Sequence, residues 1–136
     1  MKRYVACVIG CVLLGSSASA APTSADECVG AKLPASLGVI DQMASNSLDL
    51  TKSRAITQLF LGSPKALAKL QPSLTQAGYK VSLDPAGGRL IAAKDEVVTS
   101  DWVKSVIPQM CNAAARNAVE YDGWDVDVAA DHISSN

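Results

Sequence analysis

The order in which the hydrophobic period changes along residues 37–128 constrains the fold more than any other feature of this sequence. Over residues 37–47, apolar side chains recur at helical spacing at Leu37, Ile40, Met43 and Ala44. Residues 55–61 have the composition of a strand. Residues 63–78 then carry an N-capping serine, a proline at the first helical position and a terminal glycine, which is the punctuation of a helix. This part of the chain therefore predicts a short amphipathic helix, a strand and a second helix.

The rest of the pattern predicts a hairpin, a helix and a final strand. Residues 79–83 alternate apolar and polar side chains, residues 84–88 are turn formers, and residues 89–94 supply the partner strand. Ser100 is placed to cap a helix with one apolar face, formed by Val103, Val106, Ile107, Met110 and Ala114. From Tyr121 the period changes to two. The order β-α-β-β-α-β predicts an α+β, ferredoxin-like fold: an antiparallel sheet with two helices on one face, plus a short N-terminal helix.

Two prolines lie inside the predicted helices. Proline removes a backbone donor and its ring clashes with the preceding turn. We therefore expect a kink or a break at Pro72 and a disturbance at Pro108.

Residues 1–20 have the three parts of a secretory signal peptide. Lys2 and Arg3 precede an apolar run over residues 4–14, and small residues follow. Ala18-Ser19-Ala20 fits the cleavage rule, so we predict cleavage after Ala20. The apolar run is shorter than the roughly 20 residues that cross a bilayer, so no stable membrane insertion is expected after cleavage. Lipoprotein processing at Cys11 is an alternative, although it leaves a very short apolar run before the cysteine.

Cleavage would leave a single domain in the periplasm or outside the cell. We expect residues 21–36 to be a flexible leader, residues 37–128 the folded domain and residues 129–136 a mobile tail. Cys28 and Cys111 would be the two remaining cysteines, and in an exported protein they are predicted to pair, the alternative being two buried free thiols. With Lys2 and Arg3 removed, the net charge is about −3, and no basic cluster indicates a nucleic acid or an anionic membrane as a partner.

Three stretches resemble one family. "VIDQMASNSLDLTKSRAITQLFLGSP", "ALAKLQPSLTQAGYKV" and "EYDGW" are similar, in this order, to segments of the regulator of ribonuclease E activity B (RraB) family. The similarity extends over about residues 37–128. It implies a small ferredoxin-like domain that binds a protein, in the founding case the endonuclease ribonuclease E, and catalyses no reaction. Ribonuclease E is cytoplasmic, so an exported relative could not meet it.

The segment "VEYDGWDVDV" invites a calcium-site interpretation, because carboxylates are good ligands for hard cations. The spacing of these aspartates does not match an EF-hand loop. Asp125 and Asp127 lie on one face of a strand, and Asp122 lies on the other face unless the chain bends at Gly123. We interpret the segment as a strand with Trp124, Val126 and Val128 toward the core and the aspartates toward solvent or a partner. The candidate partner-binding residues are Tyr121, Asp122, Trp124, Asp125 and Asp127.

Catalytic constellations find little support in the sequence. The single histidine, His132, lies in the expected mobile tail, whereas a catalytic triad needs a rigidly held imidazole. Asp95, Glu96 and Asp101 fall between a strand and a helix, where carboxylates interact favourably with the helix dipole. For Trp102 and Trp124, core packing is favoured over a role as interface anchors. We therefore predict no enzymatic activity, no catalytic residues, no metal and no cofactor.

The functional hypothesis is an exported, non-enzymatic protein-binding domain of the cell envelope. It would act as an inhibitor or as an immunity protein that neutralises a toxin delivered to the periplasm. One alternative is a cytoplasmic ribonuclease E inhibitor whose N-terminus is not cleaved. The other is a small metal-binding protein that uses the acidic C-terminal strand.

Overall fold

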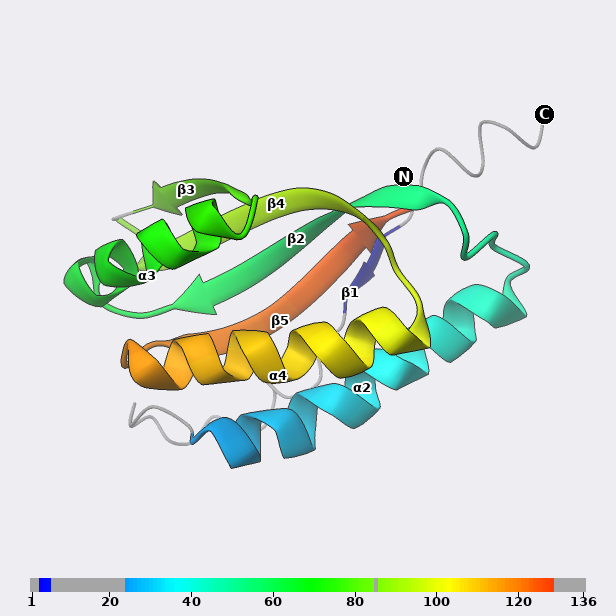
Figure 1. Ribbon diagram of the computed structural model, residues 1–136, viewed down its shortest axis with the longest axis horizontal. Helices are drawn as coiled ribbons and strands as arrows, with labels where there is room; N and C mark the ends of the chain where they lie inside the picture. Colours follow the sequence, from blue (N-terminus) through cyan, green and yellow to red (C-terminus); the bar gives the residue numbers. More distant parts are fainter. Residues whose placement is uncertain (1–2, 6–23, 85, 129–136) are drawn as a thin grey trace.

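The computed structural model describes residues 3–5, 24–84 and 86–128 and contains the predicted β-α-β-β-α-β order (Figure 1). The elements are β1 Arg3–Val5, α2 Ala25–Ser45, β2 Ser53–Leu61, α3 Pro64–Gln76, β3 Lys80–Asp84, β4 Arg89–Val97, α4 Ser100–Arg116 and β5 Glu120–Asp127. All paired strands are antiparallel, in the order β1-β5-β2-β4-β3. Strands β5-β2-β4-β3 form the ferredoxin-like sheet, which confirms the predicted α+β fold. The short β1 adds a further strand at the β5 edge.

The helices lie on one face of this sheet (Figure 1). α3 packs against β3 and β4, α4 packs against β5, and α2 lies along α4. Along the strands, alternate side chains point into this helical layer and are buried, among them Ile56, Phe60, Leu90, Ala92, Trp124 and Val126. Burying these side chains against the helices supplies the main driving force for folding. Within the described residues, no helix combines the length and apolar character needed to cross a membrane.

The N-terminal helix α2 is longer than predicted. It begins at Ala25, so residues 25–36, which the sequence placed in a flexible leader, are helical. The Ser24 hydroxyl accepts a hydrogen bond from the Glu27 amide at 3.2 Å, and the Glu27 carboxylate accepts one from the Ser24 amide at 3.3 Å. This capping box satisfies two amides that the first helical turn leaves without partners. Gly30 and Pro34 weaken the apolar period of the segment, but the Ser-x-x-Glu spacing was a readable start signal.

Of the kink or break expected at Pro72, the break is absent, because α3 continues through this residue to Gln76. Pro72 cannot donate to the carbonyl of Ala68 one turn earlier, but both residues are exposed, so water can hydrate that carbonyl. α4 likewise continues through Pro108. Its N-cap is Thr99 rather than Ser100, with the Thr99 hydroxyl accepting from the Trp102 amide at 3.2 Å.

The predicted hairpin is confirmed. β3 pairs with β4 from Lys80 opposite Ala93 to Asp84 opposite Arg89. The cleavage site after Ala20 and the tail with His132 lie outside the described residues, so those predictions stay predictions. Of the predicted signal peptide, the structure describes the backbone of β1.

Candidate protein-binding surface

A β-bulge in β5 decides which side chains of the "EYDGW" motif reach the surface. Tyr121 and Trp124 are three residues apart and would point to opposite faces of a regular strand. The register instead places Phe60 opposite Tyr121 and Leu59 opposite Gly123, so Asp122 is the extra residue of a β-bulge. Gly123 has φ 117°, a conformation that residues with a side chain rarely adopt. The chain thus bends at Gly123, and the bend turns both aromatic residues toward the helices.

Trp124 is a core residue. Its side chain is 0% exposed, its indole Nε1 donates to the Ser36 hydroxyl at 2.8 Å, and its ring meets the Trp102 ring edge-on at 5.0 Å. Tyr121 is 2% exposed, donates to the Gln58 side-chain oxygen at 2.5 Å and packs against Phe60. Both side chains are buried under the helices, which is the core packing favoured for Trp124 from the sequence. That Tyr121 and Trp124 contact a partner stays a prediction.

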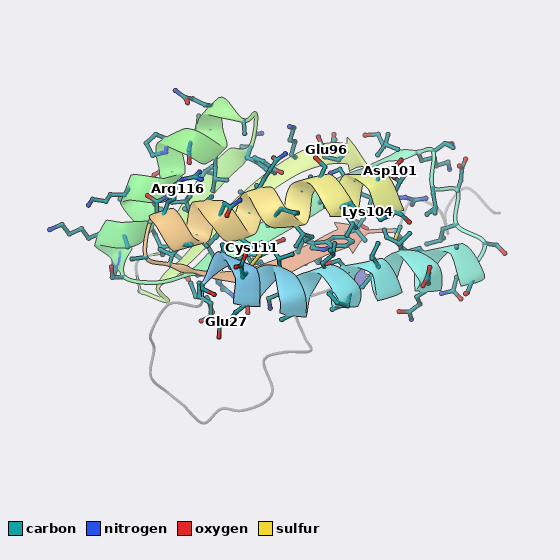
Figure 2. The ribbon with its side chains drawn as sticks, turned by 60° about the horizontal axis from the view of Figure 1, so that its bottom comes forward. Glu27, Glu96, Asp101, Lys104, Cys111 and Arg116 are labelled. Atoms are coloured by element: carbon teal, nitrogen blue, oxygen red, sulfur yellow. A yellow bond between two sulfur atoms is a disulfide. The ribbon has the colours of Figure 1, made fainter. Side chains whose placement is uncertain are left out.

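A disulfide joins α2 to α4. The sulfur atoms of Cys28 and Cys111 are 2.04 Å apart, so the predicted pairing is present in the structure. Figure 2 shows Cys111 on α4 where this helix lies beside the first turns of α2. Both cysteines are buried, at 7% and 1% exposure. The bridge holds the first half of α2 against α4, on the same side of the sheet as the bond between Ser36 and Trp124.

Gln58 is a polar residue in the core that the sequence reasoning missed. It is 0% exposed, and its Nε2 makes no hydrogen bond within the described parts of the chain. Burial raises the pKa of the Tyr79 hydroxyl, and the nearby Gln58 amide partly opposes this rise. Gln58 is in phase with Ile56 and Phe60, so the strand period did place it inward.

The three carboxylates considered for acid–base chemistry do not converge. Asp95 and Glu96 are neighbours in β4 and therefore point to opposite faces, and Asp101 is exposed in the first turn of α4 (Figure 2). Glu96 accepts from the Trp102 indole at 3.0 Å and pairs with Lys94 at 3.3 Å. These contacts give Glu96 a structural role between β4 and α4.

Lys94 connects this group to the end of α3. Its ammonium donates to the Ala77 carbonyl at 2.9 Å and lies 5.1 Å from the centroid of the Tyr79 ring. A cation at this position interacts favourably with the C-terminal carbonyls of a helix.

Over residues 3–5, 24–84 and 86–128, no group of three or more histidine, cysteine or acidic residues is arranged to hold a metal ion.

The sheet face opposite the helices carries a second set of strand side chains. Its central side chains come from β2, β4 and β5, and we call them the open face: Thr57, Leu59, Leu61, Ile91, Ala93, Asp125 and Asp127. All are half-buried, and none of the described helices covers them. The register places Asp125, Thr57, Ala93 and Lys80 in one row, and Gly123, Leu59, Ile91 and Ser82 in the next. The open face thus has an apolar centre with acidic side chains on its β5 side.

The family model described as regulator of ribonuclease activity B, RraB, matches residues 35–126. The chain belongs to the RraB family. RraB proteins are regulators that bind a protein partner, ribonuclease E, and are not enzymes. A search of curated proteins gives no match.

The RraB match also separates two parts of α2. It starts at residue 35, inside this helix, so Cys28 lies before the matched region and Cys111 within it. The disulfide therefore fastens a preceding segment onto the RraB domain. Of the candidate partner-binding residues, the structure leaves Asp122, Asp125 and Asp127 half-exposed on β5.

Proposed function

We propose that this RraB family protein is exported, catalyses no reaction, and binds and inhibits another protein of the cell envelope through its open face. The observation that carries the proposal is the half-buried apolar centre formed by Leu59, Leu61 and Ile91, which none of the described helices covers and which lies next to the acidic side chains of β5. Contiguous apolar surface bordered by polar residues is typical of protein-binding sites. Membership of a family of protein-binding regulators supports the same class of function.

Export is supported by the N-terminal sequence and by the disulfide. Residues 1–20 have the composition of a signal peptide. Disulfides persist in the periplasm and outside the cell and are rare in the cytosol. An exported RraB protein cannot meet the cytoplasmic ribonuclease E, so its partner is a different protein. An immunity role, in which the domain blocks a toxin delivered to the periplasm, fits the small size and the inhibitory character of the family.

Capture of the partner from the native host tests this function. The full chain with a C-terminal affinity tag is expressed there, and proteins that co-purify in stoichiometric amount are identified by mass spectrometry. Leu59→Glu places a charge in the centre of the open face and should reduce capture by at least about tenfold. Lys65→Glu, on the exposed side of α3, is the matched control and should capture as the wild type does. Equal capture by all three proteins would remove the open face as the binding site.

Regulation of ribonuclease E in the cytoplasm is the second candidate, favoured by the family match itself. It requires the N-terminus to remain uncleaved. Cell fractionation with mass spectrometry of the N-terminus separates the two candidates. A protein that begins at Ala21 in the periplasm supports export. An intact Met1 in the cytosol, together with inhibition of purified ribonuclease E on an RNA substrate, supports the regulator and contradicts export.

A further inference from the structure

In the described part of the chain, β1 extends the ferredoxin-like sheet by one strand at the outer edge of β5. β1 pairs with β5 alone, antiparallel, with Arg3 opposite Asp127, Tyr4 opposite Val126 and Val5 opposite Asp125 (Figure 1). Since β1 belongs to the predicted signal peptide, its removal would leave the backbone amides and carbonyls of this edge unpaired. An unpaired strand edge is a template for an extended segment of another chain.

We propose that the edge of β5 over residues 125–127 receives an extended segment of the partner protein as an added antiparallel strand. The segment carries basic residues opposite Asp125 and Asp127 and an apolar residue opposite Val126. The inference rests on the proposed function, because it takes protein binding as given and names its mode. In the uncleaved chain, residues 3–5 occupy the place of this segment.

The side-chain pattern of β5 specifies the chemistry of the segment. Asp125 and Asp127 are half-exposed and lie on the open face, whereas Val126 is buried on the helical side. Residues directly opposite in an antiparallel pair point to the same face, so a basic–apolar–basic segment matches both faces. Opposite charges across such a pair are stabilising and like charges are destabilising. A second copy of this chain is disfavoured, because edge-to-edge pairing would bring the aspartates of the two β5 strands together.

The bulge sets the start of the accessible edge. The Asp122 carbonyl accepts a hydrogen bond from the Lys32 ammonium of α2 at 3.3 Å, and Asp122 is the extra residue that interrupts the ladder with β2. The edge suited to pairing therefore begins after Gly123. This agrees with the position of β1, whose register covers Asp125 to Asp127 and does not reach the bulge.

The opposite edge of the sheet does not offer the same pattern. β3 has a basic residue at one end, Lys80, and an acidic one at the other, Asp84, and the Asp84 carboxylate is directed to Arg89 at 3.9 Å. Its outward residue between them, Ser82, is uncharged and exposed. β3 therefore lacks the two like charges on alternate positions that would select a basic segment.

A peptide titration with the full chain tests this inference. Wild-type chain and Tyr4→Pro are produced by cell-free synthesis in an oxidising buffer, so that Met1 is retained and proline at position 4 weakens the pairing of β1. The probe is a fluorescein-labelled octapeptide that alternates arginine and valine, followed by fluorescence anisotropy. Tyr4→Pro should bind it at least about tenfold more tightly than the wild type, because the tethered β1 competes for the edge. The processed protein from the periplasm should bind as Tyr4→Pro does.

Matched variants and probes separate strand addition from simple charge attraction. In the Tyr4→Pro chain, Asp125→Lys with Asp127→Lys should weaken binding by at least about tenfold, whereas Asp95→Lys, an exposed charge reversal on β4, should not. A probe that is N-methylated at alternate amides keeps its charge but loses strand hydrogen bonds, and should not bind. Circular dichroism confirms that each variant folds.

Equal binding of the methylated probe, or full binding by the double lysine variant, would overturn the inference. Self-association of the processed protein through this edge, detected by analytical ultracentrifugation, would also overturn it. Capture of an envelope partner that survives the double lysine substitution would leave the proposed function intact and exclude the β5 edge as its site.

Discussion

The β5 side and the β3 side, at opposite edges of the sheet, are stabilised by different means. On the β5 side, two helices are joined by the Cys28–Cys111 disulfide, and Trp124 is buried between the sheet and Ser36 of α2. On the β3 side a single helix, α3, packs through three buried leucines, and β3 itself contains no fully buried residue. The ion pair between Asp84 and Arg89 on that side is largely exposed. The β5 side, which is proposed to bind a partner, is therefore the more rigid one, and the β3 side should be the first to unfold locally.

Loss of the disulfide should remove most of the difference in stability between the β5 side and the β3 side. Replacing both Cys28 and Cys111 with serine should lower the free energy of unfolding by about 4 to 5 kcal/mol, because the bridge closes a loop with a sequence separation of 83. Urea denaturation followed by circular dichroism measures the change. The wild type should also melt at a lower temperature in reductant, and the double serine variant should not respond. Identical stability of the two proteins would show that the bridge contributes nothing.

Alteration of the bulge should have the next largest effect. Gly123→Ala forces a side chain into a backbone conformation with φ 117° and should destabilise the protein by about 1 to 3 kcal/mol. Gly30→Ala in α2 is the matched control, because a Cβ there meets no atom within 4 Å, and it should stabilise the helix by about 0.5 to 1 kcal/mol. Thermal melts measure both changes. A neutral Gly123→Ala would mean that the strand accommodates the two aromatic residues without the bulge.

Loss of a polar contact should destabilise the protein more on the β5 side than on the β3 side. Ser36→Ala leaves the buried Trp124 indole without its acceptor and should cost about 1 to 2 kcal/mol. Asp84→Ala removes an exposed ion pair with Arg89 and an exposed hydrogen bond from the Gly87 amide, both on the β3 side, and should cost no more than about 1 kcal/mol. Urea titration of both variants gives the comparison, and a larger loss for Asp84→Ala would reverse it.

The smallest effect concerns alkaline pH on the β3 side. Burial raises the pKa of Tyr79 above the ordinary value of 10.0, so the folded protein retains this proton at pH values where the unfolded chain has lost it. The associated stability is fully present below pH 10.0 and is lost as pH rises through the folded pKa. Between pH about 9 and about 11, stability should therefore fall less steeply in Tyr79→Phe than in the wild type. Parallel curves would show that Tyr79 does not cause the loss.

The sequence predicted those parts of the fold that depend on local periodicity. The hairpin of β3 and β4, the helical face that contains Val103 and Ile107, and the inward direction of Trp124 and Val126 all follow from the spacing of apolar residues. The cysteine pairing was predicted from the number of cysteines and from the signal-peptide pattern of residues 1–20. These features are local or depend on residue counts, so they require no knowledge of tertiary contacts.

What the sequence did not predict depends on contacts between distant segments. The burial of Tyr121, a candidate partner-binding residue, could not be predicted from the sequence, because the bulge that turns it inward is defined only by the register of β5 with β2. The first half of α2 was missed because glycine and proline dilute its period, and its position follows from the disulfide and from the bond between Ser36 and Trp124. Gln58 is in phase with the core, but nothing local indicates that Tyr121 lies within hydrogen-bonding distance.

The disulfide also makes the domain a covalent ring. Cys28 and Cys111 enclose β2, α3, β3, β4 and most of α4, including the exposed turn at Ala86 and Gly87. A protease that cuts this turn would open the polypeptide without releasing either fragment, because both would remain attached through the two sulfur atoms. A molecule nicked at this turn would therefore keep its two fragments, and the strands that they contribute to the sheet, together.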